Sequence, residues 1–516
     1  MYFRKPIKRL FARAYPRKKM EKARETLVSK FGMFSAFHGS SGGMGNLLIP
    51  AFMAVVWGGG AFFFYFLFGL LTVVTSIFIV DSCFGAYTRR APPQAWHVIT
   101  KGNKFLTFWI WFGVMSMFVY MGTAAALYGI YAVYLIGTPA LFWGSDPGTF
   151  FWVTYLTSYG PLVAALVLCF VYWLLSFKSV NVWARVAMWA KPTAIVMAVI
   201  LVIVSVVYNP NFWQGWAITF DLQPSKFLTG MVFAQAMLWV YWRSGIGSGV
   251  STAFASYLPK GGDINTSCLM ERFSDIILLV TGALFIVPLT MGFGFPPVFA
   301  GSMGLVFSAL PRAWTALGAP GILLGMLFYA LFIPAALPMN LAYFETNVAT
   351  FADKFGIPRT KTVTLTAIGV ALLAVVFTLP IYDPVNGTSF GFSMLFTAWY
   401  WEILILGLAA LFEFIVLFKY FKVDKLIAFS NETSVIRLSP KLFRFVCYLS
   451  FVMVLASMVY LVLATAGAIP GISPGAAGTI IADGTGYYGL TPIGYAMIFV
   501  GLGIPLILAL VMTATD

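Results

Sequence analysis

Twelve apolar runs, each about 20 residues or longer, constrain the fold of this chain more than any other feature. They lie near residues 32–56, 60–84, 105–137, 159–177, 186–207, 228–256, 275–298, 320–350, 363–381, 389–417, 445–467 and 490–512. A helix of about 20 apolar residues crosses the hydrocarbon core of a bilayer. The composition agrees, because 60% of the 516 residues are hydrophobic and 9% are charged, which excludes a water-soluble enzyme. We therefore predict an all-α polytopic membrane protein with twelve transmembrane helices.

Basic residues are distributed unevenly between the two sides of this predicted bundle. Residues 1–30 carry eleven Lys and Arg, and 29 of the 32 basic residues fall in this segment or near the loops on the same side. Basic loops face the cytoplasm, so we predict a multi-pass protein of the cell membrane with both termini cytoplasmic. The net charge of +15 is then explained by the orientation of the protein in the membrane, and we expect no nucleic-acid partner. The alternative is that the basic N-terminal segment binds nucleic acid.

Glycine clusters interrupt the first and the sixth runs. Residues 39–46 read Gly-Ser-Ser-Gly-Gly-Met-Gly-Asn, and residues 244–249 read Ser-Gly-Ile-Gly-Ser-Gly. Glycine inside a helix costs about 1 kcal/mol relative to alanine, so we expect both helices to unwind at these clusters. Close packing between helices through small residues is the alternative. An unwound helix offers backbone amides to an anion and carbonyls to a cation.

The two clusters occupy corresponding places if runs 1–5 and 6–10 are two inverted repeats of five helices. Broken helices at such places are typical of transporters with a substrate site near the bilayer midplane. We therefore predict two inverted repeats with helices 1 and 6 broken, preceded by a basic cytoplasmic segment and followed by two extra C-terminal helices. The predicted bounds of these four parts are 1–30, 31–207, 228–417 and 445–512.

Four short motifs stand at fixed places relative to the apolar runs. Gly42-x-x-Gly45-Asn46 is followed by Trp-Gly-Gly-Gly-Ala-Phe at 57–62, and Gly247-x-Gly249 is followed by Ala-Ser-Tyr at 255–257. Run 2 ends in Asp81-x-x-x-Gly85-x-Tyr87, and run 8 ends in Phe344-Glu345, with Arg359 beyond it. Over roughly residues 24–360 the pattern resembles the neurotransmitter:sodium symporters, a family of amino-acid and amine transporters with the inverted-repeat fold.

The resemblance implies a substrate site built from runs 1, 3, 6 and 8. Its implied members are Ser41, Met44, Gly45, Asn46, Tyr120, Trp242, Arg243, Gly245, Ser248, Met339 and Tyr343. Amides near Met44 would hold a substrate carboxylate, Tyr120 would cap it and Trp242 would be an aromatic lid. The resemblance also implies a cytoplasmic inner gate formed by Arg24 and Asp353 and supported by Ser256, Tyr257 and Glu345.

The sequence departs from the family at its ion sites. One sodium site of the family uses two adjacent hydroxyl residues in run 8, where this chain has Pro338 and Met339. Sodium prefers hard oxygen ligands, so we expect this site to be lost. At the second site the alignment puts Arg243 in place of a threonine, with Asp275 nearby as its counterion. The predicted ion or ion-surrogate residues are Gly39, Gly42, Asn46, Arg243 and Asp275.

The outer gate of the family is missing as well, because Ile49 and an apolar residue near Ala398 replace its charged partners. We expect a secondary active transporter of an amino acid or a related small carboxylate or amine, working by alternating access. Coupling would be to protons or to no ion, with His38, Asp275, Glu345 and Glu402 as the titratable groups near the unwound runs. We expect no cofactor, although a bound sodium ion is the alternative. The expected partners are a small-molecule substrate and membrane lipid.

A different class of function stays open. Loss of the ion sites and of the outer gate also fits a transporter-like protein that does not transport and serves as a receptor or as a membrane subunit of a larger assembly. A channel is disfavoured, since no ring of like charges is present. No nucleophile, histidine and carboxylate are arranged for covalent catalysis, so we expect no enzyme activity.

Overall fold

The computed structural model describes residues 26–27, 53–54, 57–142, 146–208, 210, 212–259, 261–292, 305–465, 468–469 and 492–516. Within them the chain is almost entirely helical, as expected for a polypeptide that must satisfy its backbone polar groups inside a bilayer. The long helical segments are α4 (Gly60–Gly69) continued by η2 (Leu70–Val74) and α5 (Thr75–Thr88), α7 (Lys104–Phe142), α9 (Gly160–Ser176), α10 (Val180–Tyr208), α15 (Ile264–Gly292), α17 (Ala319–Phe355), α18 (Arg359–Phe377), α19 (Phe390–Val416) continued by η6 (Leu417–Phe421), α21 (Pro440–Thr465), and α23 (Pro492–Ile498) continued by η8 (Phe499–Gly503) and α24 (Ile504–Ala514).

Shorter elements connect these segments. They are α6 (Pro92–Ile99), α8 (Pro147–Thr149), η3 (Phe150–Tyr155), α11 (Phe212–Phe220), α12 (Pro224–Phe227), α13 (Gly230–Ser244), α14 (Val250–Ala255), η5 (Leu305–Ala309), α16 (Leu310–Ala316) and α20 (Val423–Thr433). Strands β1 (Tyr382–Asp383) and β2 (Thr388–Ser389) form an antiparallel hairpin in which Tyr382 pairs with Ser389.

The predicted membrane architecture agrees with these helices. Among the described residues, eight helices are long and apolar enough to cross a membrane, or nine if the pair Pro147–Tyr155 and Gly160–Ser176, bent by 78°, forms one span. Eleven of the twelve predicted runs coincide with helical segments, and the first run lies mostly outside the described residues. The all-α polytopic class is therefore confirmed, and the division into repeats stays a prediction.

The sixth span is broken where its glycine cluster predicts a break. Helix α13 ends at Ser244, and Gly245, Gly247 and Gly249 all have positive φ angles of 59–76° before α14 begins at Val250. Residues with a side chain rarely adopt this left-handed conformation, so three glycines permit the change of direction. The span therefore consists of two short helices joined by a non-helical segment.

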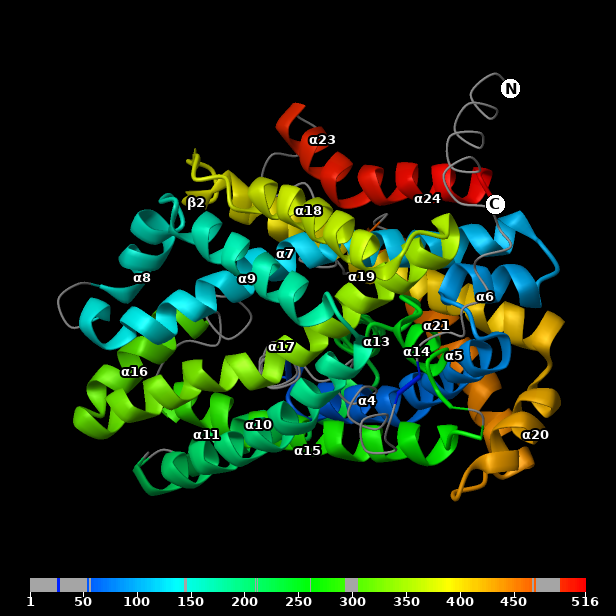
Figure 1. The fold of residues 1–516 in the computed structure, drawn as a ribbon. Coiled ribbons are helices and arrows are strands. Elements are labelled where there is room, and N and C mark those ends of the chain that lie inside the picture. The colour runs from blue at the N-terminus through cyan, green and yellow to red at the C-terminus, as the bar shows by residue number, and fades with distance from the viewer. Residues whose placement is uncertain are drawn as a thin grey trace.

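The two ends of the bundle differ in their short elements. In Figure 1, α8, α16 and the β-hairpin lie at one end of the bundle, and α6 and α20 lie at the opposite end. Most of the long helices run between these two ends, and α19 passes through the middle of the bundle (Figure 1). Helix α7 packs against both α17 and α19 and lies at the centre of the core.

Helix α15 begins earlier than its apolar run predicts. The run was placed at 275–298, whereas the helix starts at Ile264, directly after Asp263, whose Oδ1 accepts a hydrogen bond from the backbone N–H of Thr266 (3.0 Å). An aspartate at this place is a typical N-terminal cap. The apolar run starts later because the charged residues Glu271 and Arg272 interrupt it, although both side chains are buried.

Candidate functional site

Part of the predicted substrate site lies outside the described residues. This applies to Arg24, His38, Gly39, Ser41, Gly42, Met44, Gly45 and Asn46. The backbone of Arg243 belongs to the last turn of α13, but its side chain also lies outside the described part of the chain. The predicted pairing of Arg243 with Asp275 therefore stays a prediction.

The break in span 6 is lined by aromatic side chains from α7 and α17. The rings of Tyr120 and Tyr343 meet edge to face with their centroids 5.8 Å apart, and both side chains are buried. Tyr343 lies directly against Gly245, so that a Cβ atom at this glycine would collide with the tyrosine hydroxyl. Met339, one helical turn before Tyr343, and Ser248 are buried as well. Five of the predicted pocket residues are thus in the break, next to it or next to one another.

Trp242 belongs to an aromatic group at the other edge of the break. Its ring lies 5.2 Å from that of Trp399 and 5.7 Å from that of Trp239, measured between centroids. Trp399 is fixed by a 2.8 Å hydrogen bond from its Nε1 to Oγ1 of Thr123. The buried carboxyl group of Glu402 lies near the Trp242 indole. Trp242, the predicted lid, therefore packs against α19.

The region where the family has its hydroxyl pair is filled by packing. Pro338 and Met339 are buried within α17, and the indole Nε1 of Trp183 donates a hydrogen bond to the Pro338 carbonyl (3.2 Å). Trp183 itself stacks on Phe254 of α14, with centroids 4.6 Å apart. Neither the proline nor the methionine side chain has a hard oxygen for sodium.

A buried ionic cluster in α15 was missed by the sequence analysis. Arg272 is 2% exposed and its Nη1 lies 2.8 Å from Oδ2 of Asp275, while its Nη2 binds the carboxylate of Glu271. The guanidinium also lies 4.5 Å from the centroid of Phe78 in α5. Counting Arg272 as a loop charge was wrong, because its side chain is enclosed by the protein.

Two of the predicted inner-gate residues, Tyr257 and Glu345, are bonded to one another at the α6 end of the bundle, and Arg359 joins them. The predicted gate pair of Arg24 and Asp353 stays a prediction, because Arg24 lies outside the described residues. Tyr257 donates to Glu345 Oε1 (2.7 Å), and Arg359 binds both oxygens of Glu345 at 2.7 Å each. The carboxylate of Asp353 accepts a hydrogen bond from the backbone N–H of Ala91 (2.7 Å). Bidentate pairs of this kind are directional and strong, so this network ties α17 to the end of α14 and to α18.

Two buried carboxyl groups lie on α19. From the sequence, Glu402 is a titratable group near the unwound runs, and Glu413 has no predicted role. Glu402 and Glu413 are 2% and 1% exposed. Glu413 interacts with the carboxyl group of Asp81 in α5, which is also buried and accepts a 2.6 Å hydrogen bond from Thr252 of α14. The signal that could have found them is their spacing, because residues eleven apart share one face of a helix.

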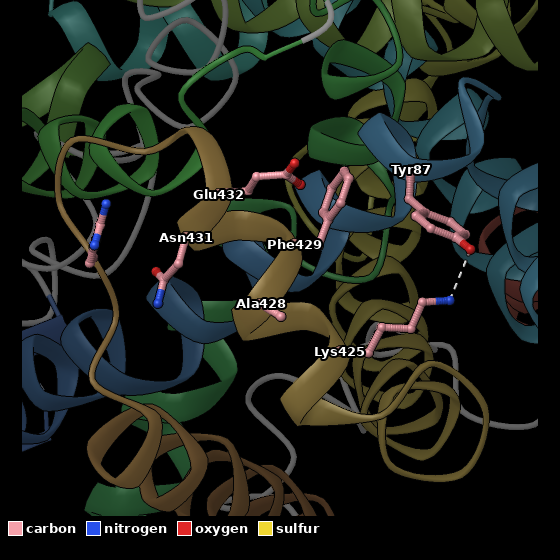
Figure 2. A pocket seen from close by; sticks show the side chains of 7 residues that line it. Tyr87, Lys425, Ala428, Phe429, Asn431 and Glu432 are labelled. Atoms are coloured by element: carbon pink, nitrogen blue, oxygen red, sulfur yellow. Dashed lines mark hydrogen bonds between the residues drawn. The ribbon is translucent and has the colours of Figure 1, made fainter.

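A surface cavity of about 580 Å³ lies elsewhere, at the α20 end of the bundle. Figure 2 shows Lys425 reaching toward Tyr87, with a 2.9 Å hydrogen bond between Nζ and the tyrosine hydroxyl. The cavity is lined by Tyr87, Lys425, Ala428, Phe429, Asn431, Glu432 and Arg437. None of these residues belongs to α7, α13, α14 or α17, so the cavity is separate from the candidate substrate site. Among the described residues, no group of three His, Cys, Asp or Glu could hold a metal ion.

Comparisons with known proteins agree with this geometry. The chain is 27% identical over 439 residues to the uncharacterized sodium-dependent transporter MJ1319 of Methanocaldococcus jannaschii, covering 80% of this chain and 86% of that protein. It is 27% identical over 356 residues to the uncharacterized sodium-dependent transporter YhdH of Bacillus subtilis, covering 63% and 71%. The crystal structure of MhsT in complex with L-phenylalanine has the same fold, with a TM-score of 0.74, 20% identity, and coverage of 84% of this chain and 99% of that chain. A model of the sodium:neurotransmitter symporter family matches residues 154–470, more than half of the sequence, and the chain belongs to this family.

Proposed function

We propose that this secondary transporter carries an amino acid or a related small carboxylate or amine by alternating access, and that sodium does not drive it. Family membership gives secondary transport of a small molecule across a membrane. The substrate class is suggested by MhsT, which binds L-phenylalanine in its structure. We also place the protein in the cell membrane with both termini in the cytoplasm, on the distribution of basic residues.

The observation that carries the proposal is the packing at Pro338 and Met339, where the family has its hydroxyl pair. Both residues are buried in α17, and the Pro338 carbonyl accepts a hydrogen bond from the indole of Trp183. Neither side chain has an oxygen for sodium, so these two positions supply no side-chain ligand to one of the two sodium sites of the family. The replacement of the other sodium site by Arg243 stays a prediction, because this side chain lies outside the described part of the chain.

Uptake into proteoliposomes tests the proposal. The purified protein is reconstituted and offered a panel of radiolabelled amino acids under a sodium gradient, under a pH gradient, and under neither. We expect saturable uptake of at least one compound that is unchanged when choline replaces sodium. Strict dependence on sodium, as the names of the relatives suggest for those proteins, would refute the sodium-free mechanism.

A matched pair of variants connects uptake to the site. Tyr343→Phe removes the hydroxyl that lies against Gly245, whereas Tyr382→Phe removes one from the exposed β-hairpin. We expect weaker substrate binding for the first variant and wild-type behaviour for the second.

The second candidate function is a receptor or a membrane subunit without transport. The dense packing of Tyr343 against Gly245 favours it, since a filled pocket leaves no room for a ligand. A folded protein that takes up no compound of the panel and binds none of them saturably would favour this reading over transport.

A further inference from the structure

The two buried glutamates of α19 lie on one stripe of the helix, on either side of the break in span 6. Glu402, Leu406, Ala409 and Glu413 are spaced by four, three and four residues, which places them on one face. The middle of this stripe contacts Gly247, whose added Cβ would lie 3.0 Å from Cβ of Ala409 and collide with the Leu406 carbonyl. Eleven residues at about 1.5 Å each separate the two carboxyl groups by about 16 Å along the helix axis.

Glu402 lies near one half of the broken span, and Glu413 is connected to the other half through Asp81. Glu402 lies beside Trp242 of α13, on the side toward the β-hairpin. Glu413 lies toward α20 and interacts with Asp81, which is bound by Thr252 of α14. Opening of α13 would therefore change the surroundings of Glu402, and opening of α14 would change those of the pair.

Neither glutamate has a cation beside it among the described residues. The titratable groups that face Glu402 are Tyr120 of α7 and Tyr343 of α17, and its Oε2 has no hydrogen-bond partner in the described part of the chain. The titratable group that faces Glu413 is the Asp81 carboxyl group itself.

An ionised carboxylate is costly to bury in a membrane interior, and two neighbouring buried carboxylates cannot both stay charged. Protons on Glu402 and within the Asp81–Glu413 pair remove both conflicts. The pair then holds one proton between its two carboxyl groups.

We propose that Glu402 and the Asp81–Glu413 pair are the proton-carrying groups of the transport cycle. Glu402 exchanges its proton when α13 opens its side of the site, and the pair exchanges its proton when α14 opens the other side. In each step a carboxylate takes up or releases one proton, with no other bond formed or broken. This inference rests on the proposed transport function and names the groups that couple it to a pH gradient.

Infrared spectroscopy of the purified protein in lipid nanodiscs tests the protonation directly, without a substrate. We expect carbonyl bands of protonated carboxylic acids near neutral pH. Glu402→Gln should remove one band, and Glu413→Gln or Asp81→Asn should remove another. Glu432→Gln, which changes an exposed acid on α20, is the control and should leave all bands unchanged. Bands that none of the three buried substitutions alters would overturn the proposal.

Transport measurements separate the inference from the proposed function. Glutamine has the shape of a protonated glutamate, so Glu402→Gln and Glu413→Gln should fold and still exchange internal for external amino acid. Both should lose accumulation driven by a pH gradient. Variants that keep this pH-driven accumulation would refute the role of these groups even if the bands are present. A wild-type protein that moves no amino acid would instead refute the transport function, while the band assignments would still hold or fail by themselves.

Discussion

Removal of the guanidinium of Arg272 should destabilise the protein more than any exposed charge does. In the wild-type protein this group binds Asp275 at 2.8 Å and also binds Glu271, and both carboxylates are fully buried. Arg272→Ala would leave two negative charges in the interior without this partner. Breaking a buried ion pair by removing one member costs about 3–5 kcal/mol of unfolding free energy, because the remaining charge stays desolvated.

The matched control is an ion pair of the same chemistry at the surface. Arg444 binds Asp424, with 49% and 74% of the two side chains exposed, and such pairs contribute about 0–1 kcal/mol. The unfolding free energies of wild type, Arg272→Ala and Arg444→Ala are compared by titration of mixed micelles with sodium dodecyl sulfate, followed by circular dichroism.

Neutralising the carboxylates should recover part of the loss. In the triple variant with Glu271→Gln, Arg272→Ala and Asp275→Asn no charge of the cluster remains, so we expect it to be more stable than Arg272→Ala alone. Equal losses for Arg272→Ala and Arg444→Ala, or a triple variant no more stable than the single one, would show that the cluster is not the buried ionic network described above.

Two further predictions concern packing and pH. Gly85→Ala should lower the free energy of unfolding by about 1–3 kcal/mol, because the added Cβ would collide with the backbone of Thr252. The control is Ala86→Ser, at a neighbouring half-buried position, which should leave the melting temperature unchanged. An unchanged melting temperature for Gly85→Ala would contradict this close packing. The backbone N–H of Thr149 and the side chain of Arg312 bind the Asp146 carboxylate and hold its pKa below the usual 3.8. The ionised Asp146 therefore stabilises the fold above pH 3.8, and this stabilisation is lost as the pH falls through the lowered pKa. Thermal melting of Asp146→Asn and of wild type should show unfolding free energies that differ by less than about 1 kcal/mol at pH 7 and become equal in acid. A difference that grows in acid would contradict the lowered pKa of Asp146.

The positions of most helices and the break in span 6 could be predicted because each depends on local sequence. A run of about 20 apolar residues has few alternatives to a membrane helix. The cluster at 244–249 contains three glycines, and all three adopt the left-handed conformation that other residues avoid.

The buried charges could not be predicted in the same way, because their burial depends on neighbours distant in the sequence. Arg272 was counted among the loop charges that set orientation, yet it is enclosed between α15 and Phe78 of α5. A charge count does not distinguish an exposed arginine from one held by Glu271 and Asp275, although their spacing on a helix gives a hint. The contact between Glu413 and Asp81 joins residues 332 positions apart and follows from the tertiary fold alone.

The buried acids of α19 bear on energy coupling in the proposed mechanism. A sodium ion that binds and leaves can transfer the energy of its gradient to the substrate, but Pro338 and Met339 offer no side-chain oxygen to such an ion. Arg272 does not replace it, because this guanidinium is fixed to α15 and its charge is balanced by Glu271 and Asp275. Uphill transport without sodium therefore requires another exchangeable charge. We expect the proton to be this charge, because Glu402 lies near one half of the broken span and the Asp81–Glu413 pair is bonded to the other half.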